Sequence, residues 1–217
     1  MRQPGVGRIV GAGWGRLRAA ALAPLCMLLA LGACTADQSG VRDWSIQARE
    51  AVLPPGVSRA APTDAAPVAA PDRAEAVLVL RETAAAWLAV LAALADDATP
   101  PDDSAALEAR AARIAAIDPA ASAAAVNLAR ATGHVARRNW GASHLAYAVD
   151  YGDPFFQAVV AALGTQPVAA RIGAGHALLM QRRSILGQAD TGRMMRAEAS
   201  ELRRLMVVRA PTEAPAR

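Results

Sequence analysis

Alanine occupies 57 of the 217 positions, and this abundance limits the folds open to the chain more than any other feature. Hydrophobic residues make up 54% of the sequence, but aromatic residues make up only 4%. Alanine favours helices and buries little surface, whereas strands are enriched in β-branched and aromatic residues. No segment shows sustained alternation of apolar and polar residues, so we expect no sheet. The composition therefore predicts an all-α fold of slim, closely packed helices.

The N-terminal segment has the features of an export signal. Residues 1–18 are rich in Gly and Arg, and residues 19–33 form an apolar run that is short for a membrane span. The run ends in Leu31-Gly32-Ala33-Cys34, which resembles the lipobox of bacterial lipoproteins. The resemblance implies that residues 1–33 are a signal peptide and that Cys34 becomes the lipidated N-terminus. An ordinary cleaved signal and an uncleaved anchor are the alternatives.

This leader also explains the net charge and the cysteine content. It holds four arginines and no acid, and in the rest of the chain 19 arginines balance 19 Asp and Glu residues. The pI near 10 is therefore no sign of nucleic-acid binding, and we expect no nucleic-acid partner. Cys26 lies in the leader, so with Cys34 lipidated no free thiol remains. Thr35 stands where the inner-membrane retention pattern has Asp, and the resemblance thus implies the periplasmic face of the outer membrane.

We expect four segments after the leader. Residues 34–52 form an anchor-proximal segment with a short amphipathic helix, in which Trp44 either lies at the membrane interface or packs on the main domain. Residues 53–72 contain five prolines and predict an extended tether. Residues 73–209 predict an antiparallel up-and-down bundle of about six helices, because their connections are short. Residues 210–217 predict a disordered tail.

Capping residues set the expected helix boundaries. The first long helix covers 73–97, and the second follows the caps available at 102–104. Asp118-Pro119 and Asp153-Pro154 each read as an N-cap followed by the first helical residue. This interpretation ends one helix at Gly152 and begins the next at Pro154. The last two helices are expected over about 167–186 and from about 190 onward.

The histidines offer weak evidence for chemistry. His134, His144 and His176 are separated by ten and thirty-two residues, and none has a carboxylate three or four residues away. A zinc hydrolase would show two histidines on one helix face. We therefore expect structural histidines, no catalytic residue, no metal and no cofactor. The alternative is a small periplasmic enzyme or metal binder that uses these three side chains.

The segment around residues 140–156 is the candidate binding surface, because it holds every Tyr and Phe of the chain. Large rings concentrate contact energy at interfaces, although the same rings could instead be the bulky part of an alanine-rich core. The arginine-rich last two helices either extend this surface or are solvated. The candidate partner-binding residues are Trp140, His144, Tyr147, Tyr151, Phe155 and Phe156.

Together these features predict a lipid-anchored cell-envelope protein that acts as a binding or structural module. Its expected partners are the membrane, through lipidated Cys34, and an envelope protein. A purely structural spacer is a further alternative. Beyond the lipobox, the composition resembles that of uncharacterised Ala/Arg-rich helical lipoproteins of proteobacteria, and this resemblance implies no activity.

Overall fold

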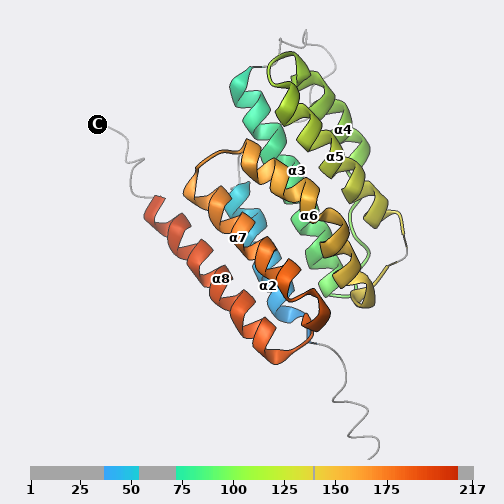
Figure 1. Ribbon diagram of the computed structural model, residues 1–217, viewed down its shortest axis with the longest axis vertical. Helices are drawn as coiled ribbons and strands as arrows, with labels where there is room; N and C mark the ends of the chain where they lie inside the picture. The colour runs from blue at the N-terminus through green and yellow to red at the C-terminus, as the bar shows by residue number, and fades with distance from the viewer. Residues whose placement is uncertain (1–36, 54–71, 139, 210–217) are drawn as a thin grey trace, which may run out of the picture. The chain divides into compact units, whose positions relative to one another are not determined.

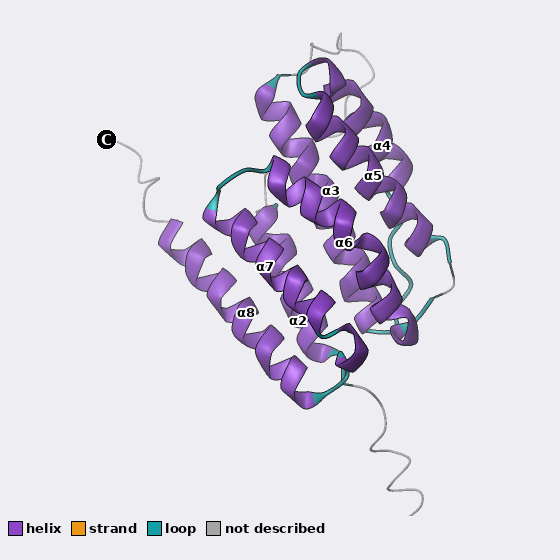
Figure 2. Ribbon diagram, in the orientation of Figure 1, coloured by secondary structure: helices purple, strands orange, loops and turns teal. Residues whose placement is uncertain are grey.

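The computed structural model describes residues 37–53, 72–138 and 140–209 (Figure 1). The predicted signal peptide, Cys34, nearly all of the predicted tether and the predicted tail lie outside these ranges. The described residues form helices and loops without a strand, which confirms the all-α class (Figure 2). The strictly antiparallel order of neighbouring helices stays a prediction. The α-helices are α2 (Ser39–Val52), α3 (Arg73–Ala95), α4 (Ser104–Arg113), α5 (Pro119–Ala136), α6 (Leu145–Ala162), α7 (Pro167–Gln181) and α8 (Ala189–Arg209).

Two aspartates cap helices that begin where the sequence predicts. The side chain of Asp72 accepts a hydrogen bond from the backbone N–H of Glu75 at 2.8 Å, at the start of α3. Asp118 accepts one from Ala121 N–H at 2.9 Å, and Pro119 is the first residue of α5. Each carboxylate satisfies an N–H group that has no partner within its own helix. These two boundaries could be placed from the sequence alone.

The prediction of a helix break at Asp153-Pro154 is wrong. Helix α6 is continuous from Leu145 to Ala162, and Pro154 lies inside it. A proline in a helix frees the carbonyl four residues earlier, here that of Asp150. Both Pro154 and Asp150 are exposed, so water can satisfy this carbonyl. The expected helix over about 167–186 is also shorter, because α7 ends at Gln181 and a 3₁₀ turn, η3 (Arg183–Ile185), follows.

Helix α3 lies in the middle of the core and contacts α2, α4, α5 and α6. Trp87, Leu88 and Leu91 on this helix have no exposed surface. Within the described ranges, α3 is the one helix long and apolar enough to cross a membrane, and 56% of the relevant stretch is buried inside the protein. Its apolar character is thus accounted for by its place in the core.

Helix α2 belongs to the same core, which corrects the expected domain boundary near Asp72. Val41, Trp44 and Ala48 have no exposed surface, and α2 packs against both α3 and α8. Of the two interpretations of Trp44, the structure therefore supports packing on the main domain, not a membrane anchor. The compact unit begins at Asp37, and residues 54–71 connect two helices of that unit.

Two close backbone approaches hold α2 in place. A Cβ atom on Gly40 would lie 2.5 Å from the Cα of Gly192, so α2 and α8 touch through their backbones at this point. A Cβ atom on Gly175 would lie 2.4 Å from the indole nitrogen of Trp44. The ring of Trp44 thus lies against the backbone of α7. Glycine is required at both positions by packing.

Candidate functional site

The structure brings most of the candidate aromatic residues together, and adds a histidine from a neighbouring helix. Tyr147, Tyr151 and Phe155 lie one turn apart on α6, with ring centroids 6.0 and 5.9 Å apart along the row. His134 on α5 stacks on Tyr151 at 4.8 Å. We call the group the ring cluster: His134, Trp140, His144, Tyr147, Tyr151 and Phe155.

Trp140 connects the loop before α6 to this row. Its ring is parallel to that of His144, with an interplanar angle of 4° and a centroid distance of 5.4 Å. It also meets Tyr147 edge-on at 5.0 Å and His134 edge-on at 6.0 Å. His144 is exposed, Tyr147 is 50% exposed, and Trp140 is partly buried. The cluster therefore presents ring surface to solvent at the start of α6, while Tyr151 and Phe155 are half-buried.

Phe156 does not belong to this surface, contrary to the sequence prediction. Its side chain has no exposed surface and stacks on His176 with a centroid distance of 4.5 Å. Successive helical residues point about 100° apart, so neighbouring Phe155 and Phe156 face different partners. Phe156 is a core residue.

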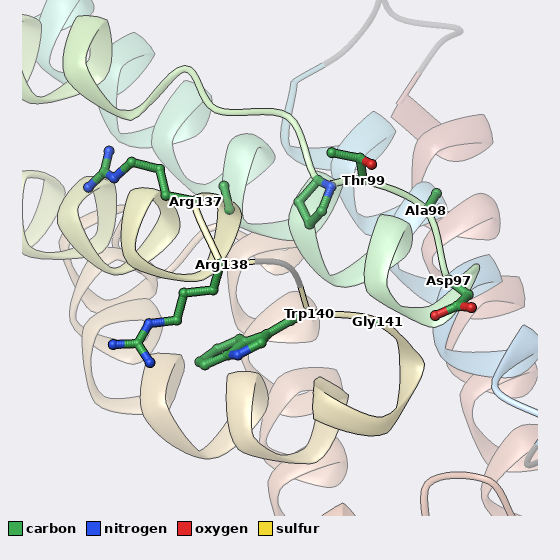
Figure 3. A pocket seen from close by; sticks show the side chains of 9 residues that line it. Asp97, Ala98, Thr99, Arg137, Arg138, Trp140 and Gly141 are labelled. Carbon is green, nitrogen blue, oxygen red and sulfur yellow. The ribbon is translucent and has the colours of Figure 1, made fainter.

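A pocket of about 440 Å³ lies beside Trp140 (Figure 3). The turn after α3 forms one wall, and the residues between α5 and α6 form the other. The guanidinium carbon of Arg138 lies 5.3 Å from the centroid of the Trp140 ring, within the range of a cation–π interaction. Arg137 points away from that ring in Figure 3 and pairs with Asp102 at 3.3 Å.

Asp97 fixes the shape of the loop that precedes α6. It has φ = 54°, a left-handed conformation that Asp tolerates better than most residues. Its carboxylate accepts a hydrogen bond from Ala142 N–H at 3.0 Å and thereby caps the short turn η2 (Ala142–His144). A Cβ atom on Gly141 would lie 2.1 Å from the same carboxylate oxygen, so a larger residue there would displace the Asp97 side chain. Sequence analysis missed this contact, which joins residues 45 positions apart.

His176 is buried and has two polar partners that sequence analysis did not find. The indole N–H of Trp87 donates to His176 Nε2 at 3.2 Å, and Nδ1 lies 2.9 Å from a carboxylate oxygen of Asp153. Since tryptophan only donates, Nε2 is unprotonated and the proton is on Nδ1. Burial lowers the pKa of His176, against the opposite effect of Asp153, and the hydrogen bond from His176 lowers the pKa of Asp153.

This arrangement gives His176 a structural role. Its side chain has no exposed surface, and both ring nitrogens are occupied by the two bonds. A general acid or base must reach the proton that it transfers. The His176 imidazole is buried and both of its nitrogens are bonded, so it does not reach a substrate. Among the described residues, no group of three or more His, Cys, Asp or Glu side chains could hold a metal ion.

The arginines of the last two helices are mostly paired in the structure. Arg182 and Arg193 both lie near Asp190, at 3.5 and 2.9 Å, and Arg204 pairs with Glu201. Arg203 donates to the side chain of Gln47 at 2.8 Å. Exposed pairs of this kind contribute little to stability, but they offset the positive charge locally. Most of the described arginines of these helices are thus offset by an acid, whereas Arg196 and Arg203 donate to the neutral side chains of Ser39 and Gln47.

Comparison of the chain with protein-family models, with curated proteins and with solved structures gave no match. The features of the chain that bear on its function are therefore the sequence motif at Cys34 and the geometry of the ring cluster.

Proposed function

We propose that this protein is a lipid-anchored binding module of the cell envelope. Cys34, made N-terminal by cleavage of the leader, carries the lipid and holds the helical unit at the periplasmic face of the outer membrane. Two or three acyl chains suffice for stable anchoring, whereas one chain gives only marginal binding. The support for this part is the sequence Leu31-Gly32-Ala33-Cys34 at the end of an apolar leader.

One observation carries the binding role. The chain has only eight Phe, Trp and Tyr residues, and three of them, Trp44, Trp87 and Phe156, are fully buried. Four others meet in the ring cluster, where Trp140 and Tyr147 remain accessible beside the pocket. Exposed rings that are not needed for the core mark a contact surface. No observation in the described residues favours the alternative of a histidine-based enzyme or metal binder.

Two experiments test the proposal. Labelled palmitate should be incorporated into the wild-type protein and not into the Cys34→Ser variant, and unlabelled wild-type protein would refute the anchor. In-cell cross-linking should show contacts that are lost in Trp140→Ala and Tyr147→Ala while helix content is unchanged. Phe156→Ala is unsuitable for this purpose because its side chain is fully buried. Cross-links that persist in both surface variants would refute the ring cluster as the contact surface.

A further inference from the structure

Very little chain separates Cys34 from the folded unit. Helix α2 begins at Ser39, five residues after Cys34 in the sequence. A chain spans at most about 3.6 Å per residue, so five residues reach at most about 18 Å. A lipid on Cys34 therefore keeps the first turn of α2 close to the membrane surface. This step rests on the proposed lipid anchor.

The first turn of α2 is surrounded by the turn after α3, the loop before α6 and the start of α8. Gln38 donates to the carbonyl of Ala142 at 3.0 Å, and Arg42 pairs with Asp96 at 3.1 Å. Arg196 donates to the hydroxyl of Ser39 at 3.3 Å. We call this region the α2 end of the unit: Gln38, Ser39, Arg42, Asp96, Asp97, Gly141, Ala142, Gly192 and Arg196.

The exposed part of the ring cluster lies at this same end. Trp140 directly precedes Gly141, and His144, whose ring stacks on Trp140, is the last residue of the turn η2 that Gln38 contacts. Tyr147, in the first turn of α6, is 50% exposed and meets Trp140 edge-on. Tryptophan and tyrosine are the residues that concentrate at membrane–water interfaces, because each combines an apolar ring with a polar group.

Among the described residues of this region, Arg138 and Arg196 have no ion pair, and Arg196 instead donates to the hydroxyl of Ser39. Arg42 pairs with Asp43 and Asp96, and Arg183 pairs with Asp150. Arg138, by contrast, is exposed, borders the pocket and has no carboxylate within pairing distance among the described residues. A guanidinium at an interface binds a phosphate oxygen well, with two parallel hydrogen bonds.

We propose that the α2 end faces the lipid bilayer, with Trp140, His144 and Tyr147 in the headgroup layer and Arg138 bound to a lipid phosphate. The acyl chains on Cys34 hold the protein at the membrane, and the ring cluster sets the orientation of the helical unit on it. The partner of the exposed rings is then the lipid surface and not an envelope protein.

Tryptophan fluorescence can test this orientation because the mature chain has a single accessible indole. Trp44 and Trp87 have no exposed surface, whereas Trp140 is partly exposed. Mass spectrometry first verifies that the N-terminal Cys34 carries the lipid. The lipidated protein is then reconstituted into phosphatidylcholine–phosphatidylglycerol vesicles, with or without brominated acyl chains. We expect brominated lipid to quench the fluorescence, and we expect Trp140→Phe to abolish the quenching with helix content unchanged.

A pair of aspartate substitutions gives the matched control. Tyr147→Asp places a charge among the rings and should lose most of the quenching. Val207→Asp places the same charge at a 70% exposed position near the C-terminal end of α8, about 27 Å along the helix from Ala189. This variant should leave the quenching unchanged. Equal quenching in the two variants, or none in the anchored wild type, would overturn the proposal.

Photo-cross-linking from position 147 distinguishes the partner. Cross-links to lipid support the proposal, whereas cross-links to protein alone overturn it and leave the proposed binding role intact. An unmodified N-terminus at Cys34 in the mass spectrum instead refutes the anchor, and with it the orientation that depends on it.

Discussion

Replacing Trp44 with Ala tests whether α2 is part of the core or an appendage beside the anchor. The indole has no exposed surface and lies against the backbone of α7 at Gly175. A tryptophan buries about 150–250 Å², which at about 25 cal/mol per Å² corresponds to roughly 4–6 kcal/mol. Mutational data for large aromatic residues give about 3–5 kcal/mol. Alanine restores a few tenths of a kcal/mol through its helix propensity.

We therefore expect Trp44→Ala to lower the free energy of unfolding by about 3–4 kcal/mol, and Tm by about 10 °C. Urea unfolding of the mature chain, followed by far-UV circular dichroism, measures the loss, with Cys34→Ser as the common background to remove the lipid. Ile46→Ala is the matched control, because Ile46 is on the same helix and 40% exposed. Its effect should stay within about 0.5 kcal/mol.

A loss below about 1 kcal/mol for Trp44→Ala, similar to that of the control, would refute the packing of α2 in the core. The boundary near Asp72 would then be the correct one, and Trp44 would again be a candidate for the membrane interface. The inferred orientation would fail with it, because that inference requires α2 to be fixed in the unit.

Three further predictions follow from single contacts. Gly152→Ala should destabilise the fold by about 1–3 kcal/mol, since its Cβ would lie 2.0 Å from the ring of Trp87, and a rise in Tm would contradict this. Gly192→Ala, whose Cβ would have only the Arg196 side chain nearby at 3.6 Å, should instead stabilise α8 by about 0.5–1 kcal/mol in the same melts. The free energy of unfolding should fall as the pH drops below about 6.5. Burial lowers the pKa of His176 in the folded protein, so the unfolded chain binds a proton on this residue at a pH where the folded protein does not. His176→Gln should weaken this pH dependence of Tm, and an unchanged slope would mean that other groups cause it.

Helix type and several helix starts could be predicted because their causes are local. Asp118-Pro119 begins α5 as expected, since the carboxylate and the ring act on the adjacent turn. Asp153-Pro154 has the same two residues but lies within α6. The difference comes from tertiary contacts: Gly152 is buried against Trp87, and Asp153 bonds to His176. Local sequence does not contain these partners.

The extent of the folded unit could not be predicted for a similar reason. The proline-rich segment after Leu53 indicates a boundary, and prolines do exclude a helix there. The structure nevertheless pairs α2 with α8, whose residues are about 150 positions later, as the close approach of Gly40 to Gly192 shows. An apolar helix face shows that something covers it, but not which part of the chain does so.

The ring cluster was predicted in part. Composition alone located it, because the few aromatic residues are concentrated between positions 140 and 156. Composition does not indicate which way each ring points, so it does not separate buried Phe156 from the cluster or add His134 to it. The Asp97–Ala142 hydrogen bond that shapes the adjoining loop was not predictable either, since it depends on how α3 and α6 meet.

The place of α2 in the core changes what a protease could accomplish. A cut between residues 54 and 71 would yield a short N-terminal peptide and a larger C-terminal fragment, joined only by non-covalent packing around Trp44. The two pieces would stay together as a nicked protein until the helix itself dissociated. Cleavage in this connection would therefore not by itself shed the larger fragment.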